Sequence, residues 1–192
     1  IERFPDCVKR GNWFDGSSVE GYARILESDM YLKPDLSTLA VLPWEDDGQV
    51  AAKIICSLQT PGGELFKGDP RTALAQVSAE AQTMGFEFIV APELEFILYV
   101  PKEGNKIGLL AQDKSGYFDL SAGPQISIRK EMVWTLNEMS IKVETSHHEL
   151  AAGQQEIDFA PVNAIRSADN LVTSRYTIKA IAQKHGMGAT FM

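Results

Sequence analysis

The sequence contains little cysteine, and this scarcity argues against a structural zinc site. Cys7 and Cys56 are the only cysteines in 192 residues, and with three histidines they do not form a ligand quartet of the usual spacing. Both cysteines lie among apolar residues. We therefore expect each to be a buried structural thiol in a reducing compartment.

Basic residues and long apolar runs are also scarce. Lys and Arg total 18 against 26 Asp and Glu, which gives a formal net charge of −8 at pH 7. Binding to nucleic acid needs clustered basic side chains, so this balance argues against a nucleic-acid partner. The most apolar stretch, FIVAPELEFILYV, holds two glutamates and is too short to span a membrane. We expect a soluble, cytoplasmic protein without a membrane partner.

Common nucleotide-binding and hydrolase motifs are missing as well. The chain has neither a Walker-type phosphate loop nor a Gly-x-Gly-x-x-Gly turn between a strand and a helix. Ser17 and Ser18 do not lie in a recognisable nucleophile elbow, which argues against a Ser-His-Asp hydrolase. If ATP binds, metal ions and side chains must hold it in place of a glycine-rich loop.

The patterns that are present predict an α+β fold. Strands are expected at residues 51–60, 86–100 and 141–150, and again in QQEIDF after an Ala-Ala-Gly turn. Turn residues gather at 62–67. We place a domain boundary there, between residues 1–66 and 67–192.

Three helices are predicted in the second part of the chain. The first begins at an Asp69 cap and ends at Gly85, the second covers about 127–139, and the third runs from a Ser167 cap to Gly186. Apolar residues recur at helical spacing in each, so one face of each helix is expected to be buried. These residues are Leu74, Val77, Ala81 and Met84, then Ile128, Met132, Leu136 and Met139, then Leu171, Ile178 and Ala182.

Carboxylates are concentrated on the predicted strands. Alternate residues of a strand face the same side, so Glu93 and Glu95 in PELEF point together. Such a pair is either a solvated strand face or a site that shares a proton or a cation. Apolar neighbours on both faces favour a strand that is covered on both sides.

A second acidic segment, SHHELAAGQQEIDF, extends this pattern. His147 and Glu149 share one face, and Glu156 can return antiparallel beside Glu149 after the turn. The four glutamates can then converge from adjacent strands, and oxygen ligands without cysteine suit Mg²⁺ or Mn²⁺. The histidines are expected to be hydrogen-bonded core or surface residues.

An early polar stretch, NWFDGSSVEGYARILESDM (12–30), mixes carboxylates and serines with Trp13, Phe14 and Tyr22. A surface loop does not need these aromatic residues, and a core does not accept carboxylates without partners. We interpret one of its acidic side chains as part of an active site.

Together these motifs resemble the type I glutamine synthetases. WFDGSSVEGYARILESDMYLKPD, PELEF, GYFD, VETSHHELAAGQQEIDF and HGMGATFM occur in the order and approximate spacing of that family. The resemblance covers the chain from about residue 12 to its last residue. It implies a small β-grasp domain, here residues 1–66 without its start, followed by the N-terminal half of a catalytic domain with a curved antiparallel sheet.

The resemblance also implies an activity. Glutamine synthetases use ATP to join ammonia to the γ-carboxyl of L-glutamate through γ-glutamyl phosphate, with two or more Mg²⁺ or Mn²⁺ ions per complete site. They assemble into homo-oligomeric rings whose active sites are shared between adjacent subunits. By motif position, the metal and nucleotide residues are Glu95, Glu149 and Glu156 for the first metal, Glu93 for the second metal, and Glu144 and Phe159 near the nucleotide.

The ammonium pocket is implied by the same resemblance. Asp15 matches the aspartate that binds ammonium and accepts its proton, Ser18 matches a neighbour that shapes the pocket, and Tyr117 matches a residue beside it. In the family, the segment with this aspartate reaches the catalytic site of the next subunit. Because Asp is also common before Gly in turns, a plain turn role for Asp15 is the alternative.

Alternative functions stay open at this point. The product could be a γ-glutamyl ligase for another amine, or a non-catalytic relative that serves as an assembly module. The family's catalytic domain continues past ATFM, so we suspect a fragment and expect the 192-residue chain alone to be inactive.

Overall fold

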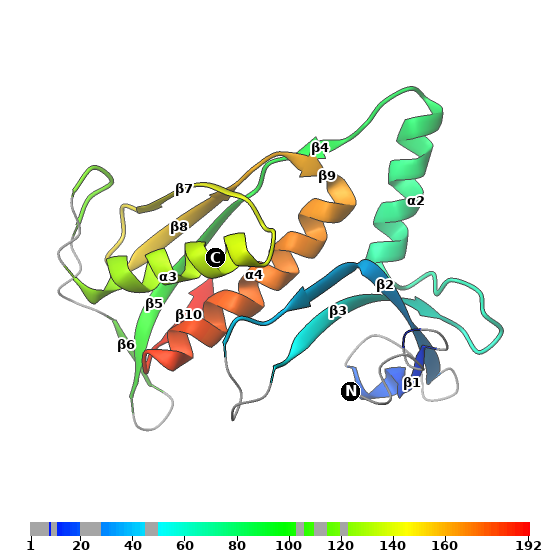
Figure 1. Ribbon diagram of the computed structural model, residues 1–192, viewed down its shortest axis with the longest axis horizontal. Coiled ribbons are helices and arrows are strands. Elements are labelled where there is room, and N and C mark those ends of the chain that lie inside the picture. Colours follow the sequence, from blue (N-terminus) through cyan, green and yellow to red (C-terminus); the bar gives the residue numbers. More distant parts are fainter. Residues whose placement is uncertain are drawn as a thin grey trace. The chain divides into compact units, whose positions relative to one another are not determined.

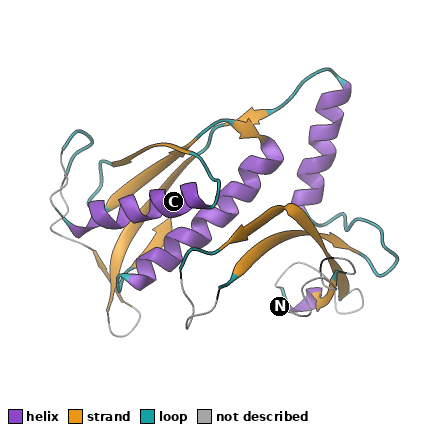
Figure 2. Ribbon diagram, viewed as in Figure 1, coloured by secondary structure: helices purple, strands orange, loops and turns teal. Residues whose placement is uncertain are grey.

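The computed structural model describes residues 8, 11–19, 28–44, 50–102, 106–109, 115–119 and 123–192. The chain divides into two compact units, residues 1–88 and 89–192, and each is described by itself. The elements are labelled in Figure 1 and coloured by type in Figure 2. Both helices and antiparallel strands are present, so the predicted α+β class is confirmed.

The first unit is built on a three-stranded antiparallel sheet in the order β1-β2-β3 (Figure 1). Strand β1 covers Asn12–Asp15, β2 covers Asp29–Val41 and β3 covers Ala52–Gln59. The short 3-10 helix η1 (Gly16–Ser18) follows β1 directly. Strand β3 matches the predicted strand, whereas the long β2 was not predicted from the polar segment in which it begins.

Helix α2 (Pro70–Thr83) begins where the sequence indicated. Asp69 caps it, and its carboxylate accepts hydrogen bonds from the backbone N–H of Arg71 (3.2 Å) and the hydroxyl of Thr72 (2.8 Å). The same carboxylate accepts a bond from the backbone N–H of Leu58 in β3. The first turn of the helix is therefore fixed to the sheet.

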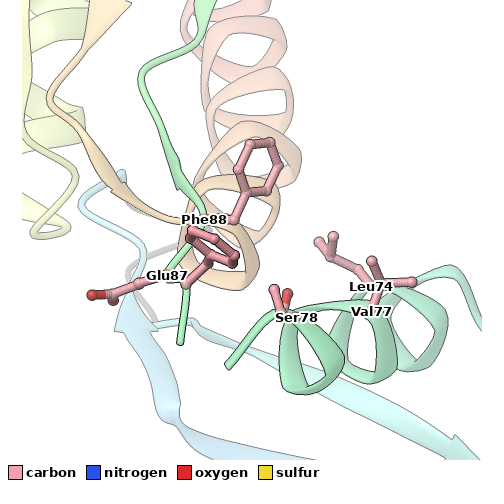
Figure 3. Close-up of a pocket in the computed structure, with 7 residues that line it drawn as sticks. Leu74, Val77, Ser78, Glu87 and Phe88 are labelled. Carbon is pink, nitrogen blue, oxygen red and sulfur yellow. The ribbon is translucent and has the colours of Figure 1, made fainter. Parts of the chain in front are cut away.

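The predicted burial of the apolar face of α2 is wrong. Val77 and Met84 are 62% and 70% exposed, and Thr72 in the first turn is the one residue of α2 that is buried. Farther along, the helix lines a pocket of about 400 Å³ together with residues 86–88 (Figure 3). Its described lining is mostly apolar, and Glu87 is the one charged residue in that part of it.

The second unit contains a five-stranded antiparallel sheet. Strands β10 (Gly188–Phe191), β5 (Glu93–Lys102), β8 (Gln154–Phe159) and β7 (Val143–His148) lie in that order, and β6 (Lys106–Leu109) also pairs with β5. A separate pair joins β4 (Ile89–Val90) to β9 (Val162–Asn163). The strand predicted at 86–100 is therefore interrupted at Ala91 and Pro92, and Pro92 has no N–H for a ladder.

Helices α3 (Pro124–Glu138) and α4 (Ala164–Lys184) contact each other, and α3 contacts β7 while α4 contacts β10. Figure 1 shows the two helices lying along the sheet. The core is formed by apolar side chains at alternate positions of β5 and β8 and by apolar side chains on one face of α3 and of α4. Its members include Leu94, Phe96, Leu98, Ile128, Met132, Leu136, Ile157 and Ile178.

The predicted helix ends needed two corrections. Helix α3 begins at Pro124 rather than near residue 127. Helix α4 is capped by Asn163, whose side chain accepts a hydrogen bond from the Arg166 N–H at 2.9 Å, whereas the predicted cap Ser167 lies buried within the helix. Gly186, at a φ of +69°, follows the helix end as predicted.

Within the described residues, no helix combines the length and apolarity that a membrane crossing would need.

Candidate metal centre

Strand register brings acidic residues into rows on one face of the second sheet. Glu95 of β5 pairs with Glu156 of β8, and Glu156 pairs with His147 of β7. Two residues along, Glu93 pairs with Asp158. Since side chains alternate along a strand, these five lie on the face opposite Phe96 and Ile157, which are fully buried. We call this surface the acidic face.

Glu149 extends the acidic face at the end of β7. Its Oε1 lies 3.2 Å from Nδ1 of His147, and Nε2 of the same ring lies 3.6 Å from Oδ2 of Asp158. The imidazole thus lies between two carboxylates. The ring of Tyr117 contacts it at 4.2 Å between centroids, so the tyrosine predicted for the ammonium pocket lies beside the acidic face.

Three of these residues have the arrangement of a metal site. One ligand atom from each of His147, Glu156 and Asp158 lies within 4.8 Å of the others. Among the described residues, these three form the group of His, Cys, Asp or Glu side chains that is close enough together to hold a metal ion. The Oδ1 atom of Asp158 is buried and has no hydrogen-bond partner among the residues that the structure describes. Carboxylate oxygens with one imidazole suit a divalent cation, so the donor set fits the predicted ion.

Burial and neighbouring negative charges raise the pKa of the Glu156 carboxyl. The residue is 7% exposed, and the pKa of its side chain is raised to about 7, with burial as the largest cause. The hydrogen bond with Asp158 and the negative charges of Asp158, Glu149 and Glu95 contribute to the same rise in pKa. A divalent cation would reverse these effects, because it favours the charged form of each carboxylate.

The predicted glutamates differ in exposure. Glu95 and Glu149 are half-buried, while Glu93 is exposed at the start of β5. Glu95 accepts a hydrogen bond from the side-chain Nε2 of Gln154 at 2.6 Å. The expectation that β5 is covered on both sides is wrong for the described residues: the apolar face is buried, and the acidic face is partly open.

Within the described residues, the two residues predicted near the nucleotide do not belong to the group of His147, Glu156 and Asp158. Glu144 is exposed and falls where the β7–β8 register shifts between Val143 and Thr145. Phe159 is 3% exposed and alternates to the buried face of β8, so its side chain is not on the acidic face. The strand geometry therefore does not bring the Phe159 ring to the carboxylates.

Asp15 and Ser18 lie in the first unit, at the start and end of η1. Oδ1 of Asp15 accepts hydrogen bonds from the Ser17 hydroxyl (2.6 Å) and the Ser17 N–H (2.9 Å), and these bonds lower the pKa of the Asp15 carboxyl. Asp15 is exposed and is held as a carboxylate. Nearby Trp13 is 57% exposed and contacts Tyr31 edge to face, whereas Tyr22 lies outside the described residues.

Sequence reasoning missed Asp158 and did not assign His147 to the site. Asp158 is two residues after Glu156, so strand alternation places both on one face and could have identified it. His147 was noted on the face of Glu149, yet its place beside Glu156 depends on the β7–β8 register.

The fold and the site define an α+β protein with a candidate divalent-metal centre on an antiparallel sheet. Residues 67–192 match the family description "Glutamine synthetase, catalytic domain", and residues 1–61 match "Glutamine synthetase, beta-Grasp domain". The chain belongs to the glutamine synthetase family.

Curated relatives named glutamine synthetase cover almost the whole chain. Identity is 44% to the Methanocaldococcus jannaschii protein over 100% of this chain, 45% to that of Thermotoga maritima over 98%, and 43% to that of Clostridium saccharobutylicum over 93%. The chain spans 41–43% of the length of these relatives.

Solved structures agree on the fold. A Plasmodium falciparum glutamine synthetase matches with a TM-score of 0.81 at 27% identity, over 97% of this chain and 42% of that one. A GmaS/ADP complex matches with a TM-score of 0.86 at 25% identity, over 100% of this chain and 44% of that one.

Proposed function

We propose that this chain forms part of an ATP-dependent glutamate–ammonia ligase. The reaction joins ammonia to the γ-carboxyl of L-glutamate through γ-glutamyl phosphate. The observation that carries the proposal is the cross-strand row of Glu95, Glu156 and His147, in a chain that belongs to the glutamine synthetase family. Phosphoryl transfer depends mainly on positioning and on neutralising charge, and clustered carboxylates that hold divalent cations serve both needs.

The cofactor in this proposal is Mg²⁺ or Mn²⁺, with ATP as co-substrate. Glu95, Glu149 and Glu156 would hold the first ion, and Glu93 would contribute to a second. When bound, the ions supply positive charge to the phosphate oxygens. His147 and Asp158 support the assignment, because they place a further nitrogen and oxygen donor beside Glu156.

The ammonium pocket in this proposal combines Asp15, Ser18 and Tyr117. Ammonium is a poor nucleophile until it loses a proton, and a nearby carboxylate both attracts the cation and accepts that proton. The exposed, ionised Asp15 has the required charge. We propose that Asp15 acts in the site of an adjacent subunit of a homo-oligomeric ring, and the exposure of Trp13 supports an interface at this segment.

ATP is proposed to bind near Glu144, which is exposed at the β7–β8 register shift. The GmaS neighbour is a complex with ADP, which supports a nucleotide site in this fold. Phe159 could contribute through its backbone, since its ring is buried. The domain division at residues 66 and 67 and a cytoplasmic location also remain proposals.

The first test is Mn²⁺ binding by the 192-residue chain, measured by calorimetry and by electron paramagnetic resonance. We expect saturable binding, and we expect Glu95→Gln and Glu156→Gln each to weaken it at least about 10-fold, because each removes a charged oxygen donor. Glu87→Gln is the matched control, since Glu87 lines the apolar pocket of the first unit. A folded chain that binds no Mn²⁺ would favour the assembly-module alternative.

The second test is activity. The chain is completed with the part of the Thermotoga maritima relative that it does not cover, and phosphate release from ATP is measured with Mg²⁺, glutamate and ammonium, each omitted in turn. Release that requires both glutamate and ammonium is expected. Release that needs another amine in place of ammonium would support the alternative γ-glutamyl ligase. No phosphate release under any condition would contradict both enzymatic functions.

A further inference from the structure

The side chain of Gln154 is held at both ends of its amide. Its Nε2 donates a hydrogen bond to Oε2 of Glu95 at 2.6 Å, and its Oε1 accepts one from the backbone N–H of Ala151 at 3.0 Å. Both bonds require the same orientation of the amide. Only its oxygen can accept from the Ala151 N–H, and only its nitrogen can donate to the Glu95 carboxylate. Gln154 is half-buried at the start of β8, on the same side as Glu156.

The backbone of Gln154 is held in the turn that connects β7 to β8. Its N–H donates to the carbonyl of Ala151 at 3.0 Å, and its carbonyl accepts from the N–H of Glu149 at 2.9 Å. The preceding carbonyl, of Gly153, accepts from the N–H of Leu98 in β5 at 3.2 Å. One residue is therefore bonded to the backbone of Glu149 and to the side chain of Glu95.

We propose that Gln154 is a positioning residue of the metal centre. It occupies Oε2 of Glu95, leaves Oε1 available to a cation, and ties this carboxylate to the turn that carries Glu149. Two proposed ligands, one on β5 and one in the β7–β8 turn, are thereby set in one geometry before a cation binds. This inference rests on the proposed function, because it takes Glu95 and Glu149 to be metal ligands.

A purely structural role makes a different prediction. If Gln154 only stabilises the turn, its loss lowers the free energy of unfolding, and Mn²⁺ affinity measured well below the unfolding temperature stays the same. If it orients Glu95, affinity falls even when the protein is fully folded. Side chains that orient metal ligands typically change affinity by about 10- to 100-fold when they are replaced.

The test compares Gln154→Met with Gln155→Met by Mn²⁺ titration. Methionine keeps the length of glutamine and removes both amide hydrogen bonds. Gln155 is the matched control because it is adjacent, fully buried on the opposite face, and bonded to Arg129 of α3. We expect Gln154→Met to weaken Mn²⁺ binding at least about 10-fold, and Gln155→Met to lower the unfolding temperature with less than about a twofold change in affinity.

Gln154→Asn provides a second variant if the methionine variant does not fold. It retains the amide but is one methylene too short to reach both partners, so it should also lose affinity. Unchanged affinity in the folded Gln154 variants, or equal losses in the Gln154 and Gln155 variants, would overturn the proposal. Absence of Mn²⁺ binding by the unsubstituted chain would instead contradict the proposed function itself.

Discussion

Glu156 is the residue at which burial and charge conflict most directly. The residue is 7% exposed, and its carboxyl lies among other carboxylates and has a pKa raised to about 7. Between its ordinary pKa and this value, the folded protein holds a proton that the unfolded chain releases. Stability must therefore fall as pH rises through this interval, since the folded state binds more protons there.

We expect the free energy of unfolding of the metal-free protein to drop by about 3 kcal/mol from this group between about pH 4.5 and pH 8. Urea unfolding in EDTA across this range measures it. Glu156→Gln should remove most of the drop, because the amide does not ionise. Equal pH dependence in the two proteins would show that Glu156 is not the group responsible.

Residue identities in the site were predictable to different extents. PELEF and QQEIDF indicated the faces of Glu93, Glu95 and Glu156, because alternation is a local property of a strand. The place of Phe159 near a nucleotide was taken from the family resemblance, although the same alternation puts its ring on the buried face. The raised pKa of Glu156 depends on Asp158 of the same strand and also on Glu149 and Glu95 from other segments, and no local pattern supplies those two neighbours.

The β7–β8 turn is the element on which the centre depends, and Gly153 shapes it. Its φ is +73°, and a Cβ at this position would lie 3.3 Å from the carbonyl oxygen of Leu98 in β5. Residues with a Cβ atom are disfavoured at this positive φ, and here the neighbouring strand also limits the space for a Cβ.

Gly153→Ala should therefore destabilise the fold by about 2 kcal/mol, and Gly186→Ala by about 1 kcal/mol. Gly186 is the matched control, because its φ is +69° and nothing lies within 4 Å of the position that a Cβ would take. Chemical unfolding of both variants gives the difference. Gly153→Ala should also weaken Mn²⁺ binding, since the turn carries Glu149, and equal effects of the two substitutions would argue against close packing at Gly153.

Helix α2 shows where an element-level pattern failed. Its cap at Asp69 was predicted correctly because capping involves nearby backbone groups. Its apolar spacing predicted a buried face, yet Val77 and Met84 are exposed, and Val77 lines the pocket beside residues 86–88. Periodicity identifies an apolar face, but only tertiary contacts decide whether another element covers it.

At the scale of the whole molecule, the proposed catalytic residues are distributed between the two compact units. Asp15 and Ser18 belong to residues 1–88, and the acidic face belongs to residues 89–192. If Asp15 serves the site of an adjacent subunit, two defective subunits can complement each other.

We expect Asp15→Asn and Glu95→Gln to be nearly inactive separately in the completed protein. After mixed reassembly, activity should return to about a quarter of the unsubstituted value, because about a quarter of the shared sites would pair two intact contributions. Phosphate release measures it. No recovery, despite confirmed mixed oligomers, would place Asp15 in the site of its own subunit.

The sequence by itself determined the α+β class, the α2 cap and the strand faces that carry Glu93, Glu95 and Glu156. These features follow from backbone periodicity and from hydrogen bonds between near neighbours. Only the tertiary structure decided that Glu95, Glu156 and His147 form one row, and that Gln154 reaches Glu95. Strand register joins residues about 60 positions apart, and long-range pairing and packing fix it.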